Sequence, residues 1–359
     1  MSTLRKIPGH LPALNAIGWN AHCAAAFAAL DNPRGRPALI AEQHRAHSGV
    51  HDGSAILKAQ TMSGLFTRLE AAGDGLAVGD WVLIGEDGGS LYITDLLPRK
   101  SLLKRSRGES GVQRIVANVD TAVLVMGLDG DYSPNRMERY LLMVRAAHVA
   151  PLIVLTKPDR CDNAQACAAE IALLAGPATP VFVLDARTAL ALGVLAPFLA
   201  EGLTLVLLGS SGVGKSTLMN TLLGDGSQRT GATREHDDKG RHTTTARTLR
   251  LLPQGACLID TPGVRELRLS GDEEVEADAF DDIAILALNC RFRDCRHESE
   301  PGCAVVTLLA PARLANYHKL RRELALLEQS RLAAAERKRG DKNADKETAR
   351  YPRDSDKRR

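Results

Sequence analysis

The chain has 359 residues, with 46 Lys and Arg against 43 Asp and Glu, so its net charge is only +3. Hydrophobic residues make up 44% and no apolar run reaches the roughly 18 to 20 residues that span a bilayer, so we expect no membrane partner. The first twenty residues lack the apolar core of a secretory signal, and seven cysteines favour a reducing cytoplasm and metal ligation over a disulfide framework.

The charge is unevenly distributed along the chain. Residues 331–359 contain eleven Lys or Arg and six Asp or Glu, a net charge of +5, so residues 1–330 carry a net charge of −2. The positive excess lies at the C-terminal end, which is either a solvated tail or a contact for RNA phosphates.

The N-terminal third predicts a short extension and a small β-domain. Residues 1–36 are rich in Ala, with Pro and Gly breaks, and we expect a loosely attached extension. Residues 37–107 contain short β-like runs separated by Gly- and Asp-rich turns, which favour a small barrel or sandwich. The strands are expected at 38–41, 55–59, 80–84 and 91–94. The alternative is a β-rich adaptor that has no ligand of its own.

Residues 112–270 predict an α/β domain. Continuous apolar runs are typical of parallel strands that are buried on both faces, and they occur at 121–126, 151–156, 181–184 and 204–208. Helical patterns at 135–147 and 163–174 lie between them.

Residues 209–216 read GSSGVGKS, between an apolar run and a helical run, which is the context a phosphate-binding loop requires. Lys215 is expected to contact the β and γ phosphates, and Ser216 to bind Mg²⁺. The residues expected to surround the phosphates are Gly209, Ser210, Ser211, Gly212, Val213, Gly214, Lys215, Ser216 and Thr217.

The sequence TKPD follows the run at 151–156. Guanine presents two adjacent donors, N1–H and the 2-amino group, which one carboxylate accepts together, whereas adenine does not. We therefore expect a guanine site formed by Thr156, Lys157, Pro158 and Asp159. One alternative is that TKPD is only a surface turn capped by Asp159. A second is that the chain is a P-loop ATPase or kinase that acts on a small molecule.

Two further motifs lie after the phosphate loop: GRHTTT at 240–245 and DTPG at 260–263. Asp260 and Thr244 are expected near Mg²⁺, and the Gly263 N–H near the γ-phosphate. Val264 stands where a water-orienting Gln would be expected, so His242 is the candidate for that role; alternatively it is a switch-loop residue that contacts RNA or solvent. The motif order is permuted, because TKPD precedes the phosphate loop, and we hypothesise that the nucleotide state repositions the C-terminal module.

A cluster of cysteines and a histidine follows. Cys290, Cys295, His297 and Cys303 form a full tetrahedral ligand set, which predicts one structural zinc ion. Arg291, Arg293 and Arg296 lie between the ligands and either face RNA or are solvated. We expect a zinc-binding and helical module at 271–339, with a helix over 311–338, and a disordered basic tail at 340–359.

These motifs, with LAVGDWV, IVANVD, NRMERYL and CRFRDCRHESEPGC, resemble the ribosome small-subunit-dependent GTPase A family over about residues 37–325. The resemblance implies an OB-fold barrel, a central circularly permuted P-loop GTPase domain and a C-terminal zinc module with helices. It also implies a GTPase that assists late maturation of the 30S subunit, contacts 16S rRNA, and is stimulated by that subunit.

This sequence departs from the family pattern where the guanine motif begins, because Thr156 replaces Asn, and Asp185-Ala186 stands where Ser-Ala is usual. We expect a cytoplasmic monomer that binds GTP or GDP with Mg²⁺. The alternative is an RNA-binding nucleotide switch in which hydrolysis is incidental.

Overall fold

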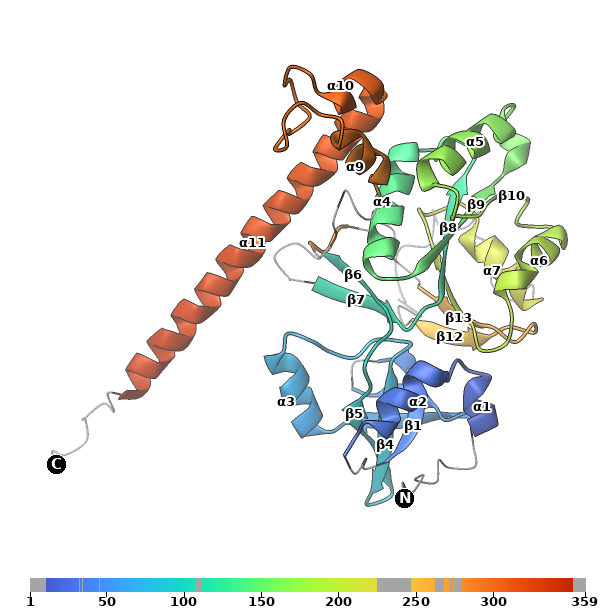
Figure 1. Cartoon of the computed structure of the whole chain (residues 1–359). Coiled ribbons are helices and arrows are strands. Elements are labelled where there is room, and N and C mark those ends of the chain that lie inside the picture. Colours follow the sequence, from blue (N-terminus) through green and yellow to red (C-terminus); the bar gives the residue numbers. More distant parts are fainter. Residues whose placement is uncertain are drawn as a thin grey trace, which may run out of the picture. The chain divides into compact units, whose positions relative to one another are not determined.

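A computed structural model describes residues 11–31, 33, 35–44, 46–106, 112–224, 247–261, 268–271, 273, 275 and 279–350 of the chain. It divides into two compact units, Met1–Arg268 and Leu269–Arg359 (Figure 1). Each unit is described by itself.

The first unit contains a closed five-stranded barrel. Its strand order is β1-β2-β3-β5-β4, with β4 pairing back to β1, and all pairs are antiparallel except β3–β5. The helix α3, Ser63–Ala71, lies between β3 and β4. The strands are β1 Arg36–Gln43, β2 Ser48–His51, β3 Ile56–Thr61, β4 Trp81–Asp87 and β5 Ser90–Leu96. The expected barrel of OB type is confirmed, with β2 as a strand that the sequence did not predict.

The expectation of a loosely attached N-terminal extension is wrong for its described part. Two helices, α1 Leu11–Asn15 and α2 Ala21–Ala28, flank the buried side chain of Trp19. Its ring meets that of Trp81 edge-on, with centroids 4.8 Å apart. Buried aromatic area is a large source of stability, so this segment is part of the folded unit.

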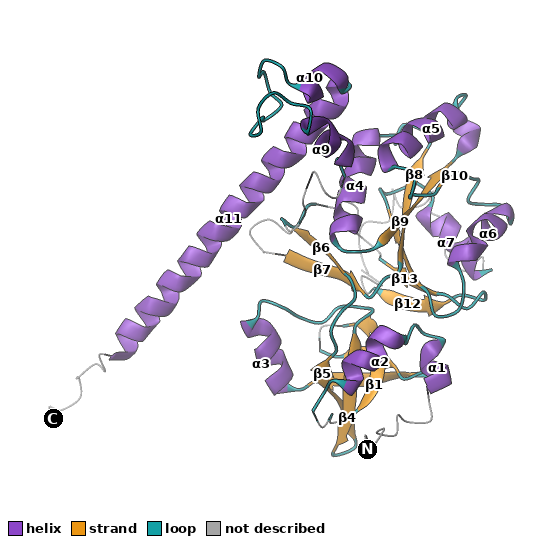
Figure 2. Ribbon diagram, viewed as in Figure 1, coloured by secondary structure: helices purple, strands orange, loops and turns teal. Residues whose placement is uncertain are grey.

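The α/β part is a parallel sheet ordered β10-β9-β8-β11-β13, with β12 antiparallel at its end. Helices α4 and α5 cover one face, and α6 and α7 the other (Figure 2). The strands are β8 Thr121–Gly127, β9 Ala150–Thr156, β10 Val181–Val183, β11 Thr204–Leu208, β12 Thr248–Leu251 and β13 Cys257–Asp260. The helices are α4 Pro134–Ala146, α5 Ala164–Ala175, α6 Leu190–Leu195 and α7 Lys215–Leu223, with the short 3₁₀ turns η2 Pro158–Arg160 and η3 Ala196–Phe198.

The barrel and the α/β part share one continuous sheet. Glu42 of β1 pairs with Thr248 of β12, which joins all eleven strands. A separate ribbon, β6 Leu102–Ser106 with β7 Val112–Ala117, links the two parts along the chain. The ribbon spans the boundary that we expected between the domains at 37–107 and 112–270.

The second unit contains α9 Asp281–Ala287, α10 Ala304–Leu308 and the long helix α11 Pro311–Arg350. Phe280 and Tyr317 form its aromatic centre, with ring centroids 5.5 Å apart. The helix α11 runs to Arg350, so the prediction that residues 340–359 are disordered is wrong for 340–350, while 351–359 lie outside the described residues. Among the described helices, none is both long enough and apolar enough to cross a membrane.

Candidate functional site: a phosphate loop, a guanine motif and a zinc-ligand cluster

The nucleotide motifs meet at one edge of the sheet. Because β8, β9, β11 and β13 run parallel, their carboxyl ends lie on the same side, where open α/β sheets bind ligands. The phosphate loop follows β11, the sequence TKPD follows β9, and Asp260 ends β13. Segments about a hundred residues apart therefore contribute to one site.

The phosphate loop requires glycine at two of its turns. A Cβ on Gly209, at φ +148°, would lie 2.2 Å from the carbonyl oxygen of Val125, too close for any side chain. Gly214, at φ +100°, has the left-handed backbone that glycine favours, immediately before α7 begins at Lys215. The loop therefore approaches β8 closely and leads directly into the N-terminus of α7, where a phosphate could be bound.

Lys215 lies folded against this loop. Its Nζ donates to the carbonyl oxygen of Gly209 at 2.8 Å and to that of Ser210. Burial lowers the pKa of Lys215 to about 8, although the negative charges of Asp131 and Asp260 partly oppose that shift. Loss of hydrating water thus disfavours the charged ammonium form of Lys215. The negative charge of a bound phosphate group would stabilise that form again.

Thr156 ties the guanine motif to the phosphate loop. Its buried hydroxyl is 2.5 Å from the carbonyl oxygen of Val213 and 3.3 Å from that of Met126. The residue that departs from the family pattern therefore fixes the end of β9 against the phosphate loop. Pro158 follows as the first residue of η2, with Asp159 inside that turn.

Lys157 and Asp159 have different surroundings. Lys157 adopts a left-handed backbone, φ +58°, and its Nζ donates to Asp129 at 2.6 Å, which holds the pKa of that carboxyl below its usual range. Asp159 is half exposed, and Arg187 approaches its carboxylate at 3.5 Å. Arg187 binds Asp185 more closely, at 2.7 Å, so the loop after β10 lies beside the carboxylate of Asp159.

Sequence reasoning missed three polar residues at this edge. Arg136 of α4 donates to Asp131, in the loop after β8, and to the hydroxyl of Ser210 at 2.5 Å. The hydroxyl of Tyr140 lies 3.5 Å from the same oxygen of Ser210. A sequence signal for these residues was available. The segment GLDGDYSPNR directly follows a run typical of a buried parallel strand, and the loops after parallel strands meet at one edge of the sheet.

The predicted magnesium and switch residues are only partly described. Ser216 stands in the first turn of α7 and Asp260 ends β13, near enough to Lys215 to affect its pKa. Thr261 is buried, and its hydroxyl donates to the carbonyl oxygen of Leu207 at 3.3 Å. His242, Thr244 and Gly263 lie outside the described residues, as does Val264.

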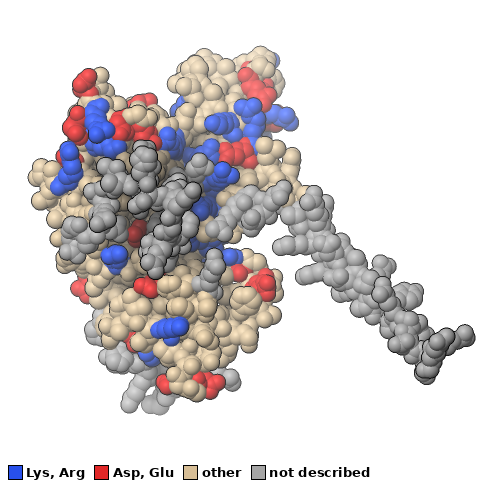
Figure 3. Space-filling view, turned by 180° about the vertical axis from the view of Figure 1, so that it is seen from behind, with Lys and Arg blue, Asp and Glu red and all other residues tan. Residues whose placement is uncertain are grey.

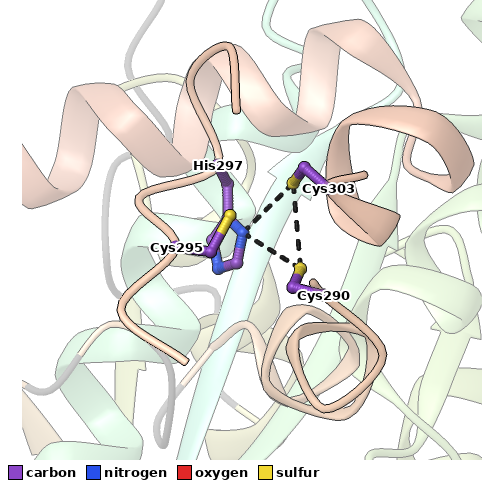
Figure 4. Close-up of side chains that lie close together, drawn as sticks. All are labelled: Cys290, Cys295, His297 and Cys303. Carbon is purple, nitrogen blue, oxygen red and sulfur yellow. Dashed lines mark hydrogen bonds between the residues drawn. The ribbon is translucent and has the colours of Figure 1, made fainter. Parts of the chain in front are cut away.

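The four predicted zinc ligands lie together in the second unit, with all their donor atoms within 4.8 Å of one another (Figure 4). The Sγ atoms of Cys290 and Cys303 are 3.8 Å apart, and Nδ1 of His297 lies 3.4 Å from Cys303 and 3.7 Å from Cys290. Sulfurs bound at about 2.3 Å to a tetrahedral zinc lie about 3.8 Å apart. The donor set and spacing, completed by Cys295, therefore fit one zinc ion.

The loop that carries these ligands is held by its own backbone contacts. The carboxylate of Glu300 accepts from the N–H groups of Arg296, Glu298 and Ser299, which lowers its pKa to about 2. His297 has a left-handed backbone, φ +61°, and its carbonyl oxygen lies 2.9 Å from Nε2 of His318 on α11. These contacts orient His297 toward the cysteines.

Comparison with known sequences shows extensive similarity to one family. Residues 96–270 match the model of the RsgA GTPase family. The "Small ribosomal subunit biogenesis GTPase RsgA" of Xanthomonas oryzae pv. oryzae (strain PXO99A) is 44% identical over 331 residues, covering 88% of this chain and 89% of the relative. The protein of that name from Xylella fastidiosa (strain 9a5c) is 44% identical over 314 residues, covering 85% and 89%.

Solved structures show a similar fold. The crystal structure of YjeQ from Thermotoga maritima has a TM-score of 0.59 at 24% identity, covering 81% of this chain and 98% of that one. YloQ, described as a circularly permuted GTPase, has a TM-score of 0.55 at 23% identity, covering 82% and 95%. The permuted motif order expected from the sequence thus has counterparts of known structure.

Proposed function

This chain belongs to the RsgA family of GTPases, and on that premise we propose that it hydrolyses GTP while it assists the maturation of the small ribosomal subunit. The enzyme class follows from the family. The substrate contacts, the ribosomal partner and the residue roles below are the proposal.

The observation that carries the proposal is the hydrogen bond between Thr156 and Val213. It joins the guanine motif to the phosphate loop, which follow the strands on either side of β8, so that one nucleotide would reach both. Asp159, half exposed, would accept both donors of guanine, while Lys157 is held beside the base by Asp129. Residues 209–217 would surround the phosphates.

The oxygen donors at this edge suit magnesium, which prefers hydroxyl, carboxylate and phosphate oxygens. Ser216 and Asp260 would hold the ion, together with Thr244. A bound Mg²⁺ would neutralise negative charge that develops on the phosphate oxygens. Gly263 would donate its N–H to the γ-phosphate.

Slow intrinsic hydrolysis is expected because Val264 has no group that orients water. His242 would take that role once the ribosomal subunit completes the site. We expect His242→Ala to lower turnover in the presence of 30S subunits and to leave nucleotide affinity unchanged. Unchanged turnover would remove His242 from the mechanism.

The zinc module would contribute RNA contacts rather than chemistry, because four protein ligands leave the ion no open position. Arg291, Arg293 and Arg296 are exposed around the ligands and would bind 16S rRNA phosphates. We propose that the protein acts as a monomer in the cytoplasm, where small subunits mature.

Guanine specificity is tested at Asp159. Xanthine carries a carbonyl where guanine carries its 2-amino group, so an amide matches xanthine and a carboxylate matches guanine. We expect Asp159→Asn to lower GTP affinity about tenfold or more, since it removes a charge-assisted pair, and to raise affinity for xanthosine triphosphate.

The matched control is Asp162→Asn, which changes an exposed carboxylate three residues further on and should preserve GTP binding. An Asp159→Asn protein that still prefers GTP to xanthosine triphosphate would contradict the proposed guanine site. The ribosomal role is tested separately by GTP turnover with and without purified 30S subunits; absence of stimulation would contradict it.

A further inference from the structure

The helix α4 presents a cation to the phosphate loop. Arg136 and Tyr140 are four residues apart and therefore lie on the same face of α4. Nη1 of Arg136 donates to the hydroxyl oxygen of Ser210 at 2.5 Å, and the hydroxyl of Tyr140 lies 3.5 Å from that oxygen. Ser210 is the second residue of the phosphate loop, so α4 and this loop are joined by side chains.

Two cations converge on this one serine. Lys215 donates to the carbonyl oxygen of Ser210, while Arg136 donates to its hydroxyl. A P-loop lysine contacts the β and γ phosphates. The guanidinium of Arg136 therefore lies at the phosphate end of the site, far from the end where Asp159 would read the base.

Asp131 holds Arg136 in this place. Its Oδ1 accepts from Arg136, and its charge also acts on Lys215. Its Oδ2 is buried and has no hydrogen-bond partner among the described residues. A lone carboxylate here would repel a phosphate group, and the paired guanidinium offsets that repulsion.

The side chain of Arg136 also remains accessible, with a third of its surface exposed. A guanidinium carries five N–H donors in a planar arrangement, so it can keep Asp131 while another of its donors reaches a phosphate oxygen. An arginine supplied by the same chain stabilises the charge that spreads over the γ-phosphate oxygens during transfer.

We propose that Arg136, held by Asp131 against Ser210, is a second cation of the phosphate site that contacts the γ-phosphate and thereby favours GTP over GDP. The proposal rests on the proposed function, since it assigns a further residue to the same nucleotide site. Arg136 would also stabilise the charge that spreads over the γ-phosphate oxygens, a role separate from orienting the attacking water.

The test compares Arg136→Gln with Arg145→Gln. Arg145 lies on the same helix but bonds Ala175 and Thr179 at the other end, so its variant matches the charge change without touching the phosphate loop. Affinities for GDP and for a non-hydrolysable GTP analogue, and the single-turnover rate with GTP alone, are measured for both variants and the wild type.

We expect Arg136→Gln to weaken binding of the GTP analogue about tenfold or more, as for loss of a hydrogen bond to a charged group, with a much smaller change for GDP. Hydrolysis should slow in parallel, whereas Arg145→Gln should match the wild type. Equal losses for GDP and the analogue, or no loss for either, would overturn the proposal.

Combining Arg136→Gln with Ser210→Ala separates a phosphate contact from a purely structural one. If Arg136 contacts phosphate, Arg136→Gln still weakens binding of the GTP analogue more than binding of GDP in the Ser210→Ala background. If Arg136 only shapes the loop through Ser210, Arg136→Gln adds no further loss in that background, and the proposal is overturned. If the wild-type protein bound neither nucleotide, the proposed function would be contradicted. If the wild-type protein bound both and Arg136→Gln bound them equally well, only the role of Arg136 would be contradicted.

Discussion

Thr156 shows how one side chain positions two loops. In the family pattern Asn begins the guanine motif, whereas this chain has Thr156 there. The hydroxyl of Thr156 reaches the carbonyl oxygen of Val213 at 2.5 Å, inside the protein. A β-branched side chain has a restricted rotamer, so this bond is formed at little cost in side-chain entropy.

We expect Thr156→Val to weaken GTP and GDP binding alike, by several-fold, because a lost buried hydrogen bond costs about 1 kcal/mol. Nucleotide titration of the purified variant measures this. Thr179→Val is the matched control, since Thr179 is also buried and bonds the carbonyl oxygen of Ala175, away from the nucleotide motifs. A Thr156→Val protein with wild-type affinity for both nucleotides would show that the bond does not position the site.

The buried position of Lys215 predicts that nucleotide binding is linked to protons. The free protein loses the Lys215 proton as the pH rises through about 8, whereas a bound phosphate stabilises the ammonium form. Binding should therefore take up a proton, and affinity should fall between pH 7 and pH 8.5. Titration calorimetry in two buffers of different ionisation enthalpy measures the uptake, which should be small at pH 7. A proton uptake that does not rise over this range would contradict the assignment.

Among the elements, the parallel strands were the easiest to predict. Runs such as TAVLVM and PLIVLT are apolar without alternation because helices cover both faces of that sheet. The strand β2, SGVH, has four residues and no alternation, so no local signal marked it. This segment is a strand because it pairs with β1 and β3, and that pairing exists only in the folded barrel.

The N-terminal helices were misjudged for a similar reason. An Ala-rich segment with Gly and Pro resembles a linker, but a single large side chain, Trp19, inserts beside Trp81. We expect Trp19→Ala to destabilise the first unit by about 3 kcal/mol, as for other buried aromatic truncations. Denaturant unfolding followed by the fluorescence of Trp81 measures this.

The control is Phe66→Ala, which truncates an aromatic ring on α3 that is 58% exposed and should change stability by less than about 0.5 kcal/mol. If Trp19→Ala were as stable as Phe66→Ala, the N-terminal segment would be a loose attachment after all.

At the scale of the whole molecule, the chain is built from two units with different sources of stability. The first has a large apolar core on both faces of its sheet, whereas the second has a small aromatic centre and the zinc-ligand cluster. Figure 3 shows Lys and Arg interspersed with Asp and Glu on one face of the described chain, in keeping with its small net charge. The location of charge, more than its total, therefore bears on the proposed binding of RNA.

We expect zinc removal to loosen the second unit and leave the first folded, because a small structural zinc module depends on its metal for folding. Hydrogen exchange after chelation should rise in residues 279–310 and stay low in β8–β11. Cys303→Ser should lose the metal, whereas Cys161→Ser, outside the cluster, should retain one zinc per chain by elemental analysis. Full zinc content in Cys303→Ser would contradict the site.

The sequence by itself determined the chemistry and the order of parts: a phosphate loop, a guanine motif placed before it, a zinc-ligand set after both, and a barrel ahead of them. These are local signals, because the types and spacing of residues within each motif (glycines, carboxylates, cysteines and apolar residues) indicate its chemistry or structure. Only the tertiary structure decided which distant residues meet there. The bond from Thr156 to Val213, the approach of Arg136 to Ser210 and the burial of Trp19 against Trp81 join segments between 57 and 74 residues apart. Such contacts depend on how strands and helices pack, which no local pattern records.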